Sequence, residues 1–256
     1  MTITRLLYPA FLALFIASGQ AQTADPTVIR VLSPGVVYNA GLLDLAAGFT
    51  KQTGVKVYVL PDLMGKIVGD IKTRDPAPDV IFLPPNLMTP LAAENKIVPG
   101  TRASLGRVEI GLAVKAGAPH PDISTVAKLV AVLKSAHQVM VSNPTDGMSM
   151  EAGIIDKLLK RPDFAGIPAI VATDSEGGQA LARGQGDMAL QLICEIYPYP
   201  QIALAGVLPP ELGAHIDNEV AVSARSPDVK NARAFIAYIT RPEAASVWKA
   251  KGLDRP

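Results

Sequence analysis

Short apolar segments alternate with segments of helical periodicity along most of this chain, and this alternation limits the fold more than any other feature. Apolar runs at residues 28–32, 55–60 and 79–83 are separated by segments whose apolar side chains recur at helical spacing. Such alternation is typical of a parallel sheet covered by helices, with right-handed crossovers between its strands. Residues 28–95 therefore predict a βαβαβ unit, in which Gly54 ends the first helix.

A second alternating region follows a longer apolar run at residues 107–114. It predicts helices at 125–135, 149–159 and about 179–183, and strands at 138–141, 169–172 and 188–193. A further strand at 219–223 returns toward the first unit. An outgoing and a returning strand between two such units predict a two-lobed α/β protein, in which each lobe is a mostly parallel sheet flanked by helices.

Two helices are expected to close the chain. Ser226 followed by Pro227 predicts the start of the first, and a capping box from Thr240 to Glu243 predicts the start of the second. These helices are assigned to the first lobe, which would comprise residues 26–106 and 216–256. The second lobe would comprise residues 107–215.

The N-terminal segment has the pattern of a secretory signal peptide. Arg5 provides the positive charge, residues 6–17 form the apolar core, and small residues precede a cleavage site near Ala21. The apolar stretch is shorter than the roughly 20 residues that span a bilayer, so an uncleaved anchor is the weaker alternative. We therefore predict that residues 1–21 are a leader and that the mature protein is periplasmic, without a membrane anchor.

Charge and composition exclude several classes of function. The formal net charge is +1 and the chain has no Lys/Arg run, which argues against nucleic acid as a partner. The single cysteine, Cys194, lies in an apolar run and is expected to be an inert buried thiol. His120, His137 and His215 lack the spacing of metal ligands, so neither a metal nor another cofactor is predicted. No heptad pattern indicates an obligate assembly, and a monomer is expected.

The loops that follow the predicted strands are the candidate ligand site. Ligands of open parallel sheets bind beyond the carboxyl ends of strands, where helix N-termini offer free N–H groups to anions. The ligand-binding residues predicted in these loops are Ser33, Gly35, Tyr38, Met64, Gly65, Lys66, Pro84, Thr145, Gly147, Ser149, Gly177 and Gln191. Each Ser or Thr here has an alternative role as an ordinary helix cap. The loops together predict a small anionic ligand.

Several segments resemble the ModA-like solute-binding proteins, which have the type II periplasmic-binding fold. The resemblance covers nearly all of residues 28–253, and it is carried by IRVLSPGVVYNAGLLDLAAGFTKQTGVKV, PAPDVIFLPPNLMTPLAAENKIVPG, VEIGLAVKAGAPHPDIS, ARGQGDMALQLICEI and AFIAYITRPEAASVWKAKGL. It implies that a ligand is held between two lobes that close by a hinge motion, and that a receptor of this kind would deliver it to an ABC permease.

The sequence departs from the molybdate receptors of that family. Their first loop usually reads like Ala-Ala-Ser-Leu, whereas here Ser33 is followed by Pro34 and Gly35. The second loop, residues 61–65, has no hydroxyl, and the tyrosine of the late strand aligns near Leu192. The sequence looks closer to the branch that handles organic acids and includes the periplasmic aconitate isomerases. A citrate- or aconitate-like polycarboxylate is therefore favoured over molybdate or tungstate.

Two functions remain open at this point. A receptor needs only complementary hydrogen bonds and a hinge, whereas an aconitate isomerase also needs an acid/base group for an allylic proton shift. The resemblance to the isomerases directs the search to Glu195 first and Glu176 second, with Tyr38 or Ser33 as relays. A carboxyl group that faces a trianion would have a raised pKa, which suits proton exchange.

Overall fold

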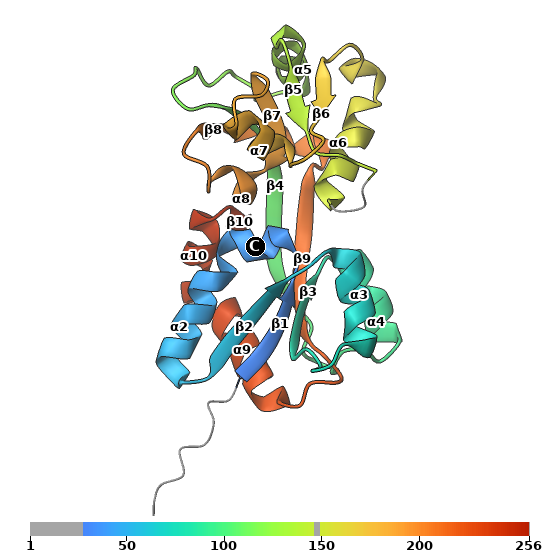
Figure 1. The fold of residues 1–256 in the computed structure, drawn as a ribbon, viewed down its shortest axis with the longest axis vertical. Coiled ribbons are helices and arrows are strands. Elements are labelled where there is room, and N and C mark those ends of the chain that lie inside the picture. Colours follow the sequence, from blue (N-terminus) through green and yellow to red (C-terminus); the bar gives the residue numbers. More distant parts are fainter. Residues whose placement is uncertain (1–27, 146–148, 256) are drawn as a thin grey trace, which may run out of the picture.

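The computed structural model describes residues 28–145 and 149–255. The predicted leader, residues 1–21, lies outside the described residues, as does Gly147. The described chain is a two-lobed α/β protein in which two long strands run from one lobe to the other (Figure 1). This confirms the predicted fold class.

The first lobe contains a parallel sheet built from the predicted βαβαβ unit. Strand β1 (Val28–Ser33) pairs in parallel with β2 (Lys56–Pro61) and β3 (Val80–Leu83). After β1 come a single turn α1 (Gly35–Val37), a π-helical turn η1 (Tyr38–Leu42) and helix α2 (Leu43–Thr53). Helix α3 (Met64–Thr73) follows β2, and α4 (Pro85–Ala93) follows β3. Gly54 ends α2 with φ 77°, in the left-handed region that favours glycine.

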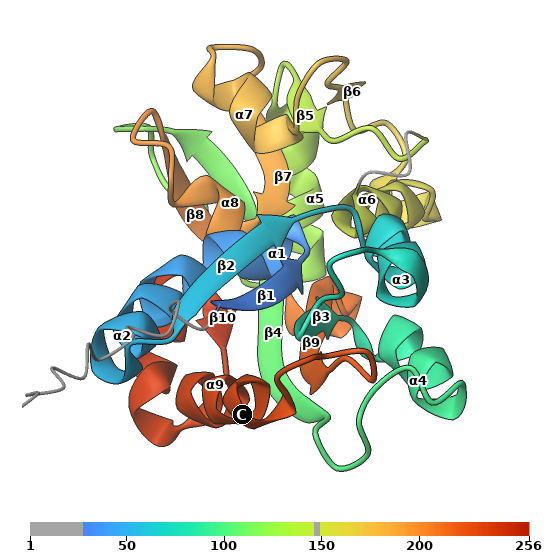
Figure 2. The same cartoon turned by 60° about the horizontal axis from the view of Figure 1, so that its bottom comes forward.

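Helices cover both faces of this sheet, which explains why its strands are nearly continuous apolar runs. Leu32 and Ile81 face α3 and α4, whereas Val31 and Phe82 face α2 and α9 (Val229–Thr240). Figure 2 shows the two pairs of helices on opposite sides of β1–β3. Successive strand residues point to opposite faces, so each apolar run supplies two core layers.

Strands β4 (Ala103–Lys115) and β9 (His215–Val222) connect the lobes (Figure 1). Residues 103–109 of β4 pair antiparallel with β9, which also pairs antiparallel with β3. Residues 110–115 of β4 pair with β7 (Met188–Leu192) and β8 (Ile202–Val207) of the second lobe. One strand thus belongs to both sheets, and the lobe boundaries at residues 107 and 216 stay a prediction.

The second lobe repeats the parallel arrangement. Strand β5 (Val139–Val141) lies between β6 (Ala169–Val171) and β7, and pairs in parallel with both. Its helices are α5 (Val126–Ser135), α6 (Met150–Leu159) and α7 (Gly177–Ala182), with a 3₁₀ turn at Pro162–Phe164. Strand β8, a 3₁₀ turn at Pro210–Leu212 and the short helix α8 (Ile193–Ile196) were not predicted from the sequence.

The two predicted helix starts near the C-terminus are wrong. Asp228, not Ser226, caps α9, because the Asp228 carboxylate accepts the N–H of Asn231 at 3.1 Å. Thr240 is the last residue of α9, and its hydroxyl donates back to the Ile236 carbonyl at 2.7 Å instead of capping a new helix. A 3₁₀ turn (Pro242–Ala244) leads into α10 (Ala245–Ala250), and β10 (Leu253–Asp254) pairs with β4.

Candidate functional site

A cavity of about 360 Å³ lies where helices from both lobes begin. The start of α1 and the start of α3 form its first-lobe wall, and the starts of α6, α7 and α8 form its second-lobe wall. Helix N-termini carry free N–H groups, and the dipole contribution is largest for α3 and α6, which have ten residues each. The lining residues are Pro34, Gly35, Val36, Pro61, Asp62, Leu63, Met64, Ser149, Met150, Glu151, Glu176, Leu192, Glu195 and Ile216.

Three glutamates of the second lobe meet on the cavity wall around one buried amide. The Nε2 atom of Gln191 donates to Glu151 Oε2 and to Glu176 Oε2, each at 3.2 Å, and also to Glu195 Oε2. The glutamates come from the first turn of α6, the residue before α7 and helix α8. The fold thus places three acidic side chains, widely separated in sequence, within reach of one cavity.

Burial keeps two of these carboxyl groups neutral at pH values where an exposed glutamate is ionised. Glu151 has no exposed surface, and burial together with the charge of Glu176 raises its pKa to about 8. Burial, followed by the charges of Glu176 and Glu151, raises the pKa of Glu195 well above its usual value. A neutral carboxyl group can donate a hydrogen bond to an anion, which an ionised one cannot do.

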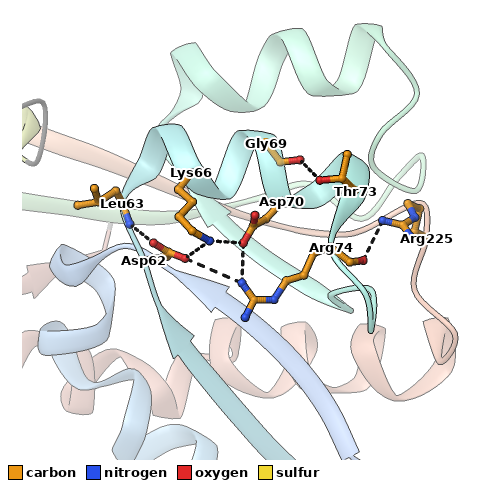
Figure 3. Close-up of polar contacts among 8 residues, drawn as sticks. All are labelled: Asp62, Leu63, Lys66, Gly69, Asp70, Thr73, Arg74 and Arg225. Atoms are coloured by element: carbon orange, nitrogen blue, oxygen red, sulfur yellow. Dashed lines mark hydrogen bonds and ion pairs between the residues drawn. The ribbon is translucent and has the colours of Figure 1, made fainter.

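Of the predicted first-lobe residues, Gly35 and Met64 line the cavity, whereas Lys66 lies outside its lining. The Lys66 Nζ atom is 2.9 Å from Asp62 Oδ2 and 2.8 Å from Asp70 Oδ2, and Arg74 pairs with the same Asp70 (Figure 3). Asp62 itself lines the cavity. The ion pairs therefore hold Lys66 at the rim, next to a carboxylate that faces the ligand site.

The remaining predicted residues lie elsewhere or play other parts. Ser33 is buried and donates to the Pro34 carbonyl at 3.1 Å. Tyr38 lines a different cavity near Lys251, and Pro84 is buried before α4. The N–H and hydroxyl of Thr145 both donate to Asn143 Oδ1, at 3.0 and 2.8 Å. None of these four side chains lines the cavity, so neither Ser33 nor Tyr38 is placed to relay protons there.

The other candidates support the cavity from its second-lobe side. Ser149 lines it, caps α6 and donates to Glu151 Oε2 at 3.0 Å. Gly177 is buried, and its N–H donates to Ser142 Oγ at 3.2 Å. Gln191 has no exposed surface and holds the glutamates instead of facing the cavity. Gly65 is exposed one residue after Met64 and is not part of the lining.

Sequence reasoning missed Glu151. An acidic residue in the first turn of a helix is ordinary, because it complements the helix dipole. The signal that could have found it is its position two residues after Ser149, in a loop that already held other candidates. Only the packing of α6 against β7 and β9 reveals that the side chain is buried.

A second cavity of about 430 Å³ adjoins the first and shares Ser149 and Glu176 with it. Hydroxyl and amide groups dominate its wall, including those of Ser142, Asn143, Thr173, Ser175 and Gln179. Within residues 28–145 and 149–255, no group of three His, Cys, Asp or Glu side chains is arranged to hold a metal ion. In the same described ranges, no helix has the length and apolar character needed to cross a bilayer.

Comparison with known proteins identifies the family. The model of the family described as bacterial extracellular solute-binding protein matches residues 29–254. The chain belongs to this family. The predicted resemblance to the ModA-like solute-binding proteins is thereby confirmed.

The individual proteins that this chain resembles have low sequence identity to it. An aconitate isomerase from Pseudomonas sp. is 26% identical over 247 residues, which cover 94% of this chain and 93% of the relative. The periplasmic molybdate-binding protein of Azotobacter vinelandii has a TM-score of 0.69 at 19% identity, over 89% of this chain and 99% of that one. Peb3 from Campylobacter jejuni, solved with bound L-phospholactate, has a TM-score of 0.59 at 18% identity, over 89% and 100% of the two chains. The two structures share the fold with this chain.

The loop after β2, which lacks hydroxyl groups, sets the character of the first-lobe wall of the cavity. Residues 61–64 line the first-lobe wall with Pro61, Asp62, Leu63 and Met64, so that wall offers apolar surface and backbone N–H groups in place of serine hydroxyls. Leu192, at the position near which family members have a tyrosine, lines the opposite wall. The hydrogen-bonding side chains are concentrated on the second lobe.

Proposed function

We propose that the cavity binds a small organic polycarboxylate of the citrate or aconitate type, and that the protein interconverts trans- and cis-aconitate. The observation that carries this proposal is the cluster of buried carboxyl groups on the cavity wall. A passive anion receptor needs only hydrogen-bond donors, whereas a proton shift also requires groups that exchange protons near neutral pH, which these buried carboxyl groups can supply. The similarity to an aconitate isomerase over 94% of the chain supports the same function.

The proposed reaction is an allylic proton shift. The reactive form has Glu195 ionised and a second carboxyl group of the cluster protonated, and the raised pKa of Glu195 makes its carboxylate a stronger base than an exposed one. This carboxylate removes a proton from the CH₂ carbon next to the double bond, and the electron pair of that C–H bond forms the new double bond. The old double bond takes up a proton from a carboxyl group of the cluster at its far carbon. One proton is removed and one is added, and the proton gained by Glu195 returns to the donor carboxyl group within the cluster, so the reaction balances without an oxidant. Glu176 is the second candidate for either role.

The same site can hold the substrate carboxylates and the charge that develops during the shift. The free N–H groups at the starts of α3 and α6 point toward anions, and a protonated Glu151 can donate a hydrogen bond. Donors fixed before the reaction stabilise developing negative charge without reorganisation. The described residues that line the cavity include no Lys, Arg or His, so recognition would rely on these neutral donors.

A receptor that binds the same anions is the second candidate, and the family assignment favours it. In that case the lobes would close on the ligand about the two connecting strands, and an ABC permease would be the partner. In either case we propose that residues 1–21 direct export and that the mature protein acts in the periplasm as a monomer.

Incubation of the purified mature protein with trans-aconitate, followed by NMR, tests the enzymatic function. We expect cis-aconitate to form, and Glu195→Gln to abolish turnover while the protein stays folded. The matched control is Glu211→Gln, since Glu211 is an exposed glutamate outside the cavity lining. The enzymatic proposal fails when the wild-type protein gives no turnover.

Thermal shift measurements separate the remaining outcomes, because a ligand that binds only the folded state raises Tm. A shift with aconitate or citrate but no turnover would assign a receptor for polycarboxylates. A shift with molybdate or tungstate alone would overturn the polycarboxylate proposal itself.

A further inference from the structure

We infer that Gln191 is a positioning residue that gathers the carboxyl groups of Glu151, Glu176 and Glu195 around one amide, so that the cluster retains a proton and shares it among its members. The use of that proton in isomerisation rests on the proposed function. The sharing itself rests on the geometry of the described residues and can be tested without turnover.

The orientation of the Gln191 amide is fixed by its carbonyl end. Gln191 Oε1 accepts the backbone N–H of Gly178 at 3.0 Å and the hydroxyl of Ser142 at 3.4 Å. A backbone N–H can only donate, so a flipped amide would place two donors against each other. The NH₂ group must therefore face the three carboxyl groups.

The lack of a side chain at Gly178 allows the backbone of α7 to lie close to the Gln191 side chain. A β-carbon at Gly178 would lie 3.1 Å from Gln191 Cγ, closer than ordinary van der Waals contact. The absence of a side chain lets the first turn of α7 reach the amide of β7 directly. The carbonyl end is consequently anchored by backbone, which is more rigid than a side-chain partner.

The hydrogen-bond count requires a proton inside the cluster. The amide has two N–H hydrogens but contacts three carboxyl groups. Glu195 also shares a hydrogen bond with the carboxyl group of Glu176. Two carboxylates have no hydrogen to share, so this contact needs one of the two to be protonated.

The surroundings supply little positive charge to replace that proton. The Cys194 thiol lies beside Glu195 and is neutral, because burial and the three glutamates raise its pKa well above its usual value. Asp62 adds a further carboxylate across the cavity, and its ion pair with Lys66 is at the rim. Helix α1 contributes only Gly35 and Val36 to the lining, and β9 contributes only Ile216. Ser142 and Ser149 bring hydroxyls to Glu151 and no charge.

The test compares Gln191→Leu with Gln179→Leu. Gln179 is a half-buried glutamine of α7 whose amide donates to the Tyr199 hydroxyl, a different partner from those of the Gln191 amide. Infrared spectra recorded during a pH titration report protonated carboxyl groups directly. We expect the buried-carboxyl band of the wild type to titrate at a different pH in Gln191→Leu and at the same pH in Gln179→Leu.

Turnover gives the second readout. We expect kcat for aconitate to fall about a hundredfold in Gln191→Leu, with a smaller change in KM and a displaced pH profile, because general acid/base catalysis contributes on this scale. Gln191→Asn, which keeps the amide on a shorter side chain, serves as a second variant when Gln191→Leu does not fold. A merely structural role would lower Tm and leave the pH profile unchanged.

The two proposals fail separately. An infrared titration that is identical in the wild type and in a folded Gln191 variant overturns the positioning role, whatever the activity. A displaced titration in a protein without isomerase activity supports the positioning role and removes only the enzymatic function.

Discussion

The Oε1 atom of Glu195 lies 3.8 Å from the position that a β-carbon on Gly35 would occupy. Gly35 begins α1 directly after β1, and Glu195 lies in α8 directly after β7, so this approach joins the two lobes across the cavity. This part of the site is thus bounded by a bare backbone on one side and a buried carboxyl group on the other. Any added atom at Gly35 enters the ligand volume.

Gly35→Ala is expected to weaken ligand binding with little loss of stability. Gly35 has no positive φ, and 3.8 Å is an ordinary contact distance, so the methyl group fits the folded protein. The added methyl group lies next to Glu195, however, and occupies space that the ligand would otherwise fill. We expect the Kd for aconitate or citrate to rise about tenfold, since a misfit of one methyl group costs 1–3 kcal/mol. Calorimetric titration and Tm measure the two effects.

Gly177→Ala should give the opposite pattern. A β-carbon at Gly177 would lie 2.9 Å from both the Met140 carbonyl oxygen and the Val141 Cα, and backbone atoms cannot move aside cheaply. We expect a loss of about 1–3 kcal/mol in the free energy of unfolding, typical of overpacking. Urea denaturation checks this value, and equal stability of the two alanine variants would contradict the packing described here.

Glu151→Gln is expected to be more stable than the wild type, by a margin that grows as the pH rises. The pKa of Glu151 is raised from 4.5 to about 8, so the stability linked to its protonated form is complete below pH 4.5 and is lost as pH approaches 8. Glutamine imitates the neutral acid at every pH. Each unit of pKa shift is worth about 1.4 kcal/mol, so the advantage of the variant should reach several kcal/mol near pH 8.

Urea unfolding at several pH values across this interval measures the effect, with the exposed Glu211→Gln as the control. A constant stability difference between Glu151→Gln and the wild type would show that Glu151 has the same pKa in the folded and unfolded states.

Asp62→Asn should strengthen the binding of polycarboxylates. The substitution removes a negative charge from the cavity wall and releases Lys66 from one of its two acidic partners. We expect a gain of about two- to fivefold in affinity, the scale of an exposed ion pair, and a smaller gain at high salt. Asp163→Asn is the matched control, since Asp163 pairs with Arg161 away from the cavity. An equal change in affinity in both variants would show that the gain does not come from the charge on the cavity wall.

Cys194 is expected to resist thiol reagents in the native protein. Its side chain is buried, its Sγ donates to the Val36 carbonyl at 3.4 Å, and its pKa is raised, so the reactive thiolate is scarce. Absorbance assays with a thiol-specific reagent should show reaction only in denaturant. Rapid stoichiometric labelling of the native protein would contradict this prediction.

Much of the fold could be predicted because its elements are encoded locally. The second helix of the predicted βαβαβ unit is observed as α3 (Met64–Thr73), and Gly54 ends the preceding helix as expected. Helix α8 escaped prediction because its four residues are too few to show a helical period, and the six-residue strand β8 was also missed. The cap of α9 was misplaced because Ser226 and Asp228 are both suitable capping residues, and Ser226 instead donates to Asp79.

The candidate site was predicted less completely. Gly35, Met64, Ser149, Glu176 and Glu195 line the cavity, because ligand sites of parallel sheets follow from strand order. Glu151 was missed, and Gln191, predicted to bind the ligand, contacts the three glutamates and is not part of the cavity lining, since the direction of a side chain depends on packing between distant segments. The sequence alone also suggested Lys66 for the ligand, but its ion pairs with Asp62 and Asp70 hold it at the rim.

The sequence by itself determined the alternation of strands and helices and the loops in which a ligand site could form, because periodicity and chain order are local properties. Only the tertiary structure decided what that site contains. Glu151 and Gln191 are 40 residues apart in sequence and 3.2 Å apart in the fold. The pKa of a carboxyl group depends on the water excluded from it and on the charges beside it, and both are set by which distant segments pack together.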